Sequence, residues 1–310
     1  MLTTMITGGT GFVGSHVVQQ ARLRGAALTL MSHRRPVPPA AAPEARVVRA
    51  DLADPGSLGG ACEGVDVLVH CASQIGGTPE DNENVNARGT EALVAEARRA
   101  GVSRIVYLST ASVYGRGSFR GALPEQLAPA PESPTSRSRL AAEDAVLAAG
   151  GIVLRPHLVY GRGDAWVVPG LVRFLRALRG AAAGWNTRIS AISAPELATL
   201  LVGLALIPPG RLTASVYHAA HPRPVTAATL LDTVADCAQL PRAAGRLTLA
   251  EARERLARDA WAAHRLDMLA TDHWFESAPV WADLGQRPGP GFEEEFAKIR
   301  TWYRDSILAP

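Results

Sequence analysis

The chain has 310 residues, of which 47% are hydrophobic and 20% charged, and its formal net charge is +3. These proportions exclude an intrinsically disordered chain, because enough apolar surface is present to form a core, and the length predicts a large domain with a smaller lobe. The positive charge is spread along the chain without a run of like charges, so we expect no nucleic-acid partner.

Short apolar runs alternate with helical patterns through the first half of the chain. The helical patterns at Ser15–Arg24 and Thr90–Ala100 are each followed by a glycine, Gly25 and Gly101, where helices commonly end. Such alternation is typical of βαβ units and a parallel sheet. The expected strands are Leu2–Ile6, Ala27–Met31, Val47–Ala50, Val65–His70, Arg104–Leu108 and Gly151–Leu154.

The regular alternation stops after Tyr160–Asp164. Beyond it, Val225–Gln239 and Leu247–Leu269 have helical patterns and predict a different, more helical lobe. The expected fold class is therefore α/β, with a Rossmann-type doubly wound parallel sheet and a smaller, mostly helical C-terminal substrate lobe. We expect the dinucleotide-binding domain to span residues 1–164, rejoined by about 187–220, and the lobe to combine residues 165–186 and 221–310.

Neither a membrane segment nor a metal site is expected. The three cysteines, Cys62, Cys71 and Cys237, have no CxxC spacing and no neighbouring histidine cluster. The longest apolar run, Leu197–Ile207, is too short to span a bilayer and predicts a buried helix. The N-terminal residues do not resemble a signal peptide, so we expect a cytoplasmic protein with no membrane partner.

The strongest local signal is the sequence TGGTGFVG at Thr7–Gly14, which follows the first expected strand and opens the first helix. Glycines there allow a tight turn and a close approach of the backbone to a pyrophosphate, while the helix N-terminus offers free N–H groups. A glycine-rich turn of purely structural origin is the alternative. The residues expected to bind a dinucleotide are Thr7, Gly8, Gly11, Phe12, Val13 and Gly14.

Further motifs follow this loop in a fixed order along most of the chain. They are Asp51-Leu52, His70-Cys71-Ala72, Asn84-Val85-Asn86 with Gly89-Thr90, the run Leu108–Gly115, the run Leu154–Gly161, and Leu284-Gly285 with Arg287-Pro288 before a final helix at Phe292–Tyr303. With these motifs the chain resembles the extended short-chain dehydrogenase/reductase family. That family comprises nucleotide-sugar epimerases, dehydratases and ketone reductases with a Rossmann domain.

The resemblance implies that the chain binds a nicotinamide dinucleotide in its Rossmann domain. Asp51 and Leu52 are then expected beside the adenine, and Cys71, Ala72 and Ser73 near the nicotinamide ribose. Packing in the core is an equal alternative for Cys71.

The end of the second expected strand decides which dinucleotide binds. An acidic residue there would hold the ribose hydroxyls of NAD, whereas basic residues would accept a 2′-phosphate. The chain has Ser32, His33, Arg34 and Arg35 at this place and no carboxylate. A guanidinium binds phosphate through paired, charge-assisted hydrogen bonds, so NADPH is expected rather than NADH. The alternative is that Arg34 and Arg35 only make the loop soluble.

The chain departs from the family at the helix that usually carries the catalytic pair. Family enzymes usually combine a Ser or Thr with the Tyr and Lys of a YxxxK motif, in which the lysine lowers the tyrosine pKa and the phenol exchanges a proton with the substrate. By the resemblance, Thr135 stands at the tyrosine position and Arg139 at the lysine position. The only lysine of the chain is Lys298, and no tyrosine lies in this segment, so both usual groups are missing.

Four residues are candidate catalytic residues. Thr110 matches the family's Ser/Thr position and is expected to hydrogen-bond a substrate carbonyl. Arg139 is expected against the nicotinamide ribose, although its high pKa prevents general-acid chemistry near neutral pH. His157 is the third candidate, because a histidine ring is able to relay protons, and Ser136 is the fourth. The ring of His70 has the same ability. The structural alternatives are a strand-end hydroxyl for Thr110, a charge on the helix surface for Arg139, and a hydrogen-bonded structural role for each of the two histidines.

These observations predict an atypical NADPH-dependent ketoreductase with a small-molecule substrate. Losing a positioned general acid costs about 10²- to 10⁴-fold in rate, whereas holding the nicotinamide against a carbonyl keeps the proximity effect. Hydride transfer is therefore expected on a ketone that its own neighbouring hydroxyl polarises, in a bulky aromatic or polyketide-like secondary metabolite. A non-catalytic NADP-binding sensor or scaffold is the first alternative, and a nucleotide-sugar epimerase or dehydratase the second. We expect a monomer or a homodimer.

Overall fold

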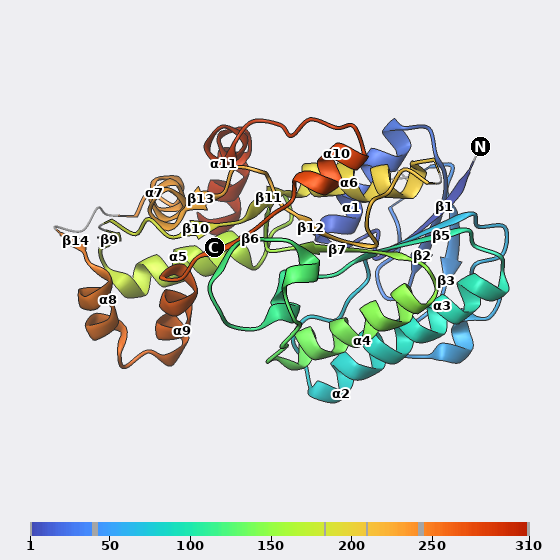
Figure 1. Ribbon diagram of the computed structural model, residues 1–310, viewed down its shortest axis with the longest axis horizontal. Coiled ribbons are helices and arrows are strands. Elements are labelled where there is room, and N and C mark those ends of the chain that lie inside the picture. Colours follow the sequence, from blue (N-terminus) through green and yellow to red (C-terminus); the bar gives the residue numbers. More distant parts are fainter. Residues whose placement is uncertain (1, 39–42, 183, 209, 241–244, 309–310) are drawn as a thin grey trace.

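The structure is a computed structural model that describes residues 2–38, 43–182, 184–208, 210–240 and 245–308 (Figure 1). Its largest sheet has seven strands in the order β12-β7-β5-β4-β1-β2-β3, and every neighbouring pair is parallel. The strands are β1 Thr3–Thr7, β2 Ala27–Ser32, β3 Arg46–Arg49, β4 Val67–His70, β5 Arg104–Leu108, β7 Ile152–Pro156 and β12 Val216–Ala219.

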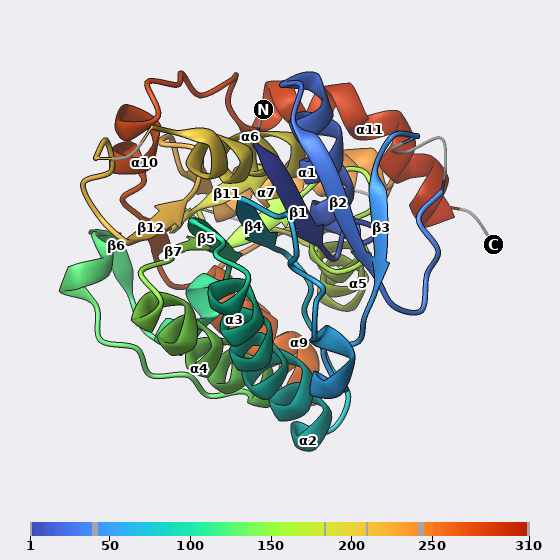
Figure 2. The ribbon, with the colours of Figure 1, turned by 90° about the vertical axis from the view of Figure 1, so that its right-hand side faces the viewer.

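Helices cover both faces of this sheet (Figure 2). On one face α1 (Phe12–Leu23) packs against α6 (Ala194–Leu206), and on the other α3 (Gly89–Arg99) packs against α4 (Pro134–Ala148). Most residues of α6 are apolar and buried, because this helix contacts α1 as well as β4 and β5. The architecture confirms the expected α/β, Rossmann-type fold and the expected buried helix.

A second lobe lies at the left of Figure 1, and five helices build its core. These are α5 Val167–Leu178, α7 Ala227–Cys237, α8 Leu249–Leu256, α9 Ala260–Leu269 and α11 Phe292–Leu308. A four-stranded sheet joins β13 Val225–Thr226, β10 Arg188–Ile189, β15 His273–Phe275 and β6 Phe119–Ala122, in that order. Other elements include β8 Leu158–Tyr160 paired with β11 Ala191–Ser193, β9 Ala181–Ala182 paired with β14 Arg246–Leu247, and the short helices α2 Pro79–Asn82 and α10 Ala278–Asp283.

The strands expected in the first half of the chain are confirmed within two residues at each end. Gly25 and Gly101 have φ values of 71° and 77°, the left-handed conformation expected of glycines at helix ends. The helical prediction for Leu247–Leu269 is wrong at its start, because Leu247 lies in β14, and Asp259 caps a separate helix, α9. The four-stranded sheet was not expected, since its strands are too short to show a period of two.

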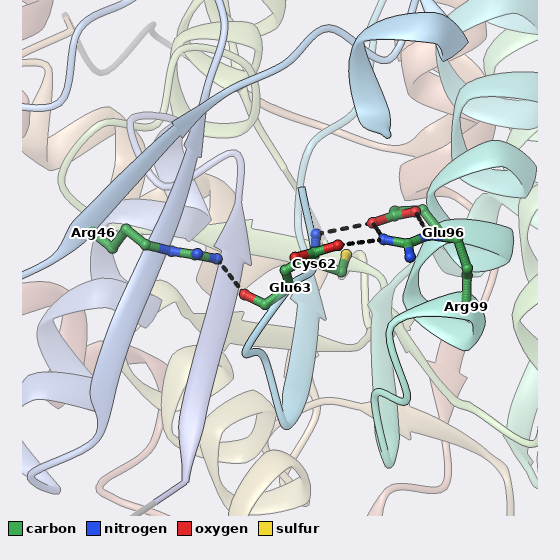
Figure 3. A network of polar contacts seen from close by, with 5 residues as sticks. All are labelled: Arg46, Cys62, Glu63, Glu96 and Arg99. Atoms are coloured by element: carbon green, nitrogen blue, oxygen red, sulfur yellow. Dashed lines mark hydrogen bonds and ion pairs between the residues drawn. The ribbon is translucent and has the colours of Figure 1, made fainter. Parts of the chain in front are cut away.

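A polar network ties the amino ends of β3 and β4 to α3 (Figure 3). Arg99 Nη2 lies 3.1 Å from Glu63 Oε1, and Arg99 Nε lies 2.7 Å from Glu96 Oε2. Arg46 donates to the Glu63 carbonyl at 2.7 Å, and the Cys62 N–H donates to Glu96 at 3.4 Å. This end of the sheet is opposite the glycine loop, so we assign the network a structural role.

Candidate functional site

The glycine loop lies at the carboxyl end of β1, just before α1. Gly8 has a φ of +68°, and a Cβ there would lie 2.7 Å from the backbone nitrogen of Ala72. A Cβ on Gly14 would lie 2.0 Å from the Gly8 oxygen. Packing therefore requires both glycines. Gly11 differs, because a Cβ there would meet only the Gly8 oxygen, at 3.1 Å.

The N-terminus of α1 fits an anionic group. Gly11 is its N-cap residue, no side chain caps the helix, and no acidic residue stands in the first turn. The first N–H groups of a helix and its positive dipole end together bind phosphate. The start of α1 at Phe12, Val13 and Gly14 is thus suited to the pyrophosphate of a dinucleotide.

The loop after β4 is held against β1 by the hydroxyl of Thr7. Its Oγ1 accepts hydrogen bonds from the N–H groups of Cys71 at 3.2 Å and Ala72 at 3.1 Å. His70 lies beneath this loop, with Nδ1 2.6 Å from Thr7 Oγ1 and Nε2 2.9 Å from Thr90 Oγ1. Burial lowers the pKa of His70 to about 3, so this histidine is neutral and structural, the alternative left open for it above.

Arg139 enters the site from α4, at the carboxyl ends of β4 and β5. Its side chain is buried, donates to Ser73 Oγ at 3.3 Å and to the Leu108 carbonyl, and lies over the Tyr107 ring. Arg139 Nε is buried without a hydrogen-bond partner. An unpaired buried N–H is costly, so a bound group that accepts from it would be stabilised. The helix-surface charge considered as its alternative does not describe this residue.

The first turn of α4 holds the hydroxyls of Thr135 and Ser136. Thr135 Oγ1 donates to Asn82 Oδ1 at 2.8 Å. Ser136 caps the helix together with Ser133, and its Oγ donates to the Ser133 carbonyl at 3.1 Å. Both hydroxyl protons are therefore already used, which weakens Ser136 as a proton donor to a substrate.

Thr110 follows β5 and caps the short helical turn Ala111–Tyr114. Its Oγ1 accepts from the Ser112 N–H at 3.1 Å and donates to Ser112 Oγ at 3.2 Å. The Thr110 proton is thus shared with a neighbouring hydroxyl and can turn to another acceptor.

A buried ion pair supports this turn from below. Glu143 of α4 accepts from Ser109 Oγ and from Arg155 Nε, the latter at 3.0 Å. Arg155 also donates to the Tyr114 hydroxyl at 2.7 Å, and that hydroxyl lies 2.7 Å from His218 Nε2. Burial raises the pKa of Tyr114 despite the Arg155 charge, so its phenol stays protonated and held within the network. We assign these residues a positioning role beside Thr110.

A cavity of about 380 Å³ opens where the carboxyl edge of the large sheet meets the second lobe. His157, which follows β7, and Ser136 lie in its wall, next to Ala111 and Ser112 of the Thr110 turn. The His157 ring stacks on His273, with centroids 5.5 Å apart and planes 8° from parallel. Burial, reinforced by His273, lowers the pKa of His157 to about 3. The other residues that line the cavity are Gly115, Arg116, Phe119, Glu132, Ser133, His264, Met268 and Phe275.

Residues 4–182 match the model of the NAD dependent epimerase/dehydratase family, which is more than half of the chain. The chain belongs to this family. The glycine loop, the loop after β4, the Thr110 turn and the start of α4 all lie in the matched part.

Curated relatives include oxidoreductases. The 2-alkyl-3-oxoalkanoate reductase of Stenotrophomonas maltophilia is 28% identical, over 96% of this chain and 98% of the relative. The 4-hydroxy-2-methyl-3-oxo-4-farnesyl-3,4-dihydroquinoline-1-oxide ketoreductase of Stigmatella aurantiaca is 29% identical, over 57% of this chain and 56% of the relative. The chain is thus similar to oxidoreductases over most or about half of its length.

Solved structures share the fold of this chain. The Bordetella bronchiseptica enzyme WbmH in complex with NAD⁺ has a TM-score of 0.76 at 20% identity, covering 98% of this chain and 99% of that one. The UDP-glucose 4-epimerase of Thermotoga maritima, with UDP-glucose, has a TM-score of 0.73 at 17% identity, covering 99% and 100%. Neighbours in complex with NAD agree with a nicotinamide cofactor in this family, and at these identities the likeness concerns the fold.

The loop after β2 carries the basic residues expected to choose between the two family cofactors. Arg34 and Arg35 are exposed, and neither forms an ion pair with a carboxylate in the part of the chain that the structure describes. Asp51 is instead paired with His33, whose Nε2 lies 2.8 Å from Asp51 Oδ2. Leu52, expected beside the adenine, is buried against Gly89 at the start of α3. The two guanidinium groups remain open to an external anion.

Replacing both Arg34 and Arg35 by alanine is expected to weaken NADPH binding and leave NADH binding nearly unchanged. Only NADPH has the 2′-phosphate, and losing its charge-assisted hydrogen bonds costs about 1.5–3 kcal/mol, roughly 10- to 100-fold in Kd. Titrating each cofactor into the parental and double-mutant proteins measures the effect. An equal loss for both cofactors would remove the assignment of this loop to the phosphate.

Sequence reasoning missed the far wall of the cavity and the groups beneath Thr110. His264, His273 and Phe275 come from short elements more than one hundred residues after the Thr110 turn, and no local motif marks them. Glu143 was missed although it follows Arg139 by one helical turn, on the same face of α4.

Cys71, expected near the nicotinamide ribose, lies in the loop after β4. Burial raises the pKa of Cys71 to about 12, so its thiol stays protonated beside the glycine loop. Among the residues described, no group of three or more His, Cys, Asp or Glu could hold a metal ion. Within the same ranges, no helix is long and apolar enough to cross a bilayer.

Proposed function

We propose that the protein is an NADPH-dependent ketoreductase that reduces a bulky aromatic or polyketide-like metabolite without the family's Tyr–Lys pair. The observation that carries this proposal is the site at the end of the large sheet. A glycine loop open to a pyrophosphate and a cavity with aromatic walls lie at the same carboxyl edge of the large sheet, while Thr135 and Arg139 occupy the start of α4. The cofactor supplies a hydride when it is bound.

The relatives support a ketone as the substrate. The Stigmatella aurantiaca relative is named as a ketoreductase of a dihydroquinoline oxide, a ring system carrying a ketone. In lacking the Tyr–Lys pair, the chain also resembles the angucyclinone ketoreductase of simocyclinone biosynthesis. This resemblance suggests a role in antibiotic biosynthesis. A flat aromatic substrate fits a wall in which Phe119, Phe275 and His157 present their rings.

The chain's own residues would bind and orient the reacting groups. Phe12, Val13 and Gly14 offer N–H groups to the pyrophosphate, and Arg34 and Arg35 offer charge to the 2′-phosphate. Arg139, placed at the family's lysine position, would donate its unpaired Nε–H to the cofactor side of the site, and it keeps its own proton because a guanidinium does not deprotonate near neutral pH.

The carbonyl side of the site depends on weak donors. Thr110 would donate to the substrate oxygen by turning away from Ser112. His157 is neutral at pH 7, so it is a poor source of protons there. The remaining stabilisation of the developing alkoxide is then assigned to a hydroxyl of the substrate itself, beside the ketone.

A non-catalytic NADP-binding sensor is the rival function. A sensor does not reduce a substrate, so it would explain the loss of the Tyr–Lys pair without a substrate that supplies its own proton. A nucleotide-sugar epimerase is the second rival, since solved neighbours with this fold are named as such. That reaction needs a protein base to move a proton, and the hydroxyl of Thr135 is bound to Asn82.

Mixing the protein with NADPH and a panel of aromatic ketones that carry a neighbouring hydroxyl tests the proposal. We expect NADPH oxidation, followed by its absorbance, and an alcohol product identified by mass. A sensor would bind NADPH and turn over none of the panel. An epimerase would interconvert UDP-sugars with no net oxidation of the cofactor, and either result would replace the ketoreductase.

A further inference from the structure

His273 lies in the cavity wall and has an unpaired ring nitrogen. The residue is 3% exposed, and its Nδ1 lies 3.1 Å from the Thr271 carbonyl oxygen. Its Nε2 is buried and has no hydrogen-bond partner. Only four buried side-chain nitrogen or oxygen atoms in the described residues share this property, and the Arg139 Nε of the same site is another of them. Such orphaned polar atoms are rare in folded proteins, and a bound group that pairs with one is stabilised by doing so.

The ring of His273 is fixed in position. His157 stacks on one side of it, and the Phe119 ring meets it edge-on with centroids 5.5 Å apart. Burial lowers the pKa of His273, although the carbonyl groups of Thr271 and Met268 oppose that effect. In a neutral ring whose Nδ1 donates to a carbonyl, Nε2 is a hydrogen-bond acceptor.

We propose that His273 Nε2 accepts a hydrogen bond from a hydroxyl group on the aromatic ring of the substrate, and thereby selects hydroxylated aromatic ketones. The inference rests on the proposed function and names the substrate class of the same site. Phe119, Phe275 and His157 supply ring surfaces around this nitrogen, so the donor must be carried on a flat, apolar body.

The hydroxyl bound by His273 is a second one. The hydroxyl beside the ketone already donates its proton to the carbonyl oxygen, so it has no proton left for Nε2. The substrate therefore carries a further hydroxyl, remote from the ketone. Its removal should weaken binding without changing the internal hydrogen bond on which the reduction depends.

Two probes that differ at one oxygen test this assignment. The first is a trihydroxyanthraquinone with one hydroxyl remote from the ketones, and the second is its ether, methylated at that hydroxyl only. Both are titrated into the protein saturated with NADP⁺, so that no reduction takes place. We expect the free hydroxyl to bind on the order of tenfold more tightly, which corresponds to about 1.4 kcal/mol.

Two matched variants locate the effect. His273→Phe keeps the aromatic ring and removes the nitrogen, so the preference for the free hydroxyl should fall to near one. His157→Phe makes the same change on the stacked neighbour and should keep the preference. If His273→Phe retains the tenfold preference, another residue reads the hydroxyl and the proposal is overturned.

A second measurement does not depend on a stable variant. Nitrogen NMR of the parental protein should show the His273 Nε2 resonance moving when the free hydroxyl binds and staying in place when the ether binds. Equal affinities of the two probes for the parental protein would overturn the role of His273 and leave the ketoreductase standing. If the parental protein binds neither probe, the aromatic substrate itself fails, and this inference fails with it.

Discussion

A Gly11→Val variant should fold and should lose the binding of both NADPH and NADH. Gly11 has φ −84° and ψ 177°, an extended backbone that valine adopts without strain. Its Cβ would meet the Gly8 oxygen at 3.1 Å, which a shift of a few tenths of an ångström relieves. The two valine methyl groups would then occupy the space at the start of α1 that the pyrophosphate needs.

Gly14→Ala is the contrasting control in the same loop. Its Cβ would lie 2.0 Å from the Gly8 oxygen, a backbone atom that cannot move without disturbing β1. We expect that variant to lose stability as well as binding. Melting temperatures and cofactor titrations of both variants separate the two effects. Parental affinity for NADPH in a folded Gly11→Val protein would place the cofactor somewhere other than this loop.

The elements that could be predicted are those whose residues repeat locally. β1, α1 and β2 follow one another within about thirty residues; a short apolar run marks each strand, and amphipathic spacing marks the helix. The glycine loop was identifiable because the tight packing at Gly8 and Gly14 leaves a strong signature in the sequence. The residues that form these features lie close together in the sequence, so a local pattern is enough to identify them.

The cavity could be predicted on one side only. His157 and Ser136 belong to motifs of the family, whereas His273 reaches the cavity because β15 pairs with β6, a strand more than one hundred residues earlier. A three-residue strand carries no periodic signal, and nothing in its sequence distinguishes His273 from a surface histidine. Only the packing of the lobe against the sheet shows it.

The buried ion pair escaped prediction for a different reason. Glu143 stands in a helix, where a carboxylate is expected to face water, and Arg155 stands at the end of a buried strand. Each is costly to bury alone, and their pairing at 3.0 Å offsets that cost. A buried pair of this kind can be inferred from the sequence only when both partners are known to face the same space.

The proposed chemistry depends on where the proton of the product alcohol comes from. Tyr107 and Tyr114 are the tyrosines nearest to Thr110 in sequence. Tyr107 is buried beneath Arg139, and the phenol of Tyr114 is held by Arg155 and His218. His157, in the cavity wall, has a pKa of about 3, so at neutral pH it lacks the second ring proton that a general acid gives. The proton that completes the alcohol must therefore come from the substrate and from water, if Thr110 supplies no more than a hydrogen bond.

Methylating the hydroxyl beside the ketone should slow reduction far more than the Thr110→Ala substitution does. After hydride arrives at the carbonyl carbon, the neighbouring phenol gives its proton to the new alkoxide, and water restores the phenol. Blocking that proton removes the general acid and should cost about 10²- to 10⁴-fold in kcat. Thr110→Ala removes one hydrogen bond and should cost roughly tenfold or less.

The comparison requires kcat for the free and methylated ketones with the parental enzyme, and kcat for the free ketone with Thr110→Ala, all at saturating NADPH. Binding of the methylated ketone must be measured as well, so that a slow reaction is not mistaken for an empty site. A methylated ketone that binds in the cavity and is reduced as fast as the free one would mean that the protein holds its own donor. His157 would then be the residue to replace, because it lies in the cavity wall and its pKa could rise when an alkoxide forms beside it.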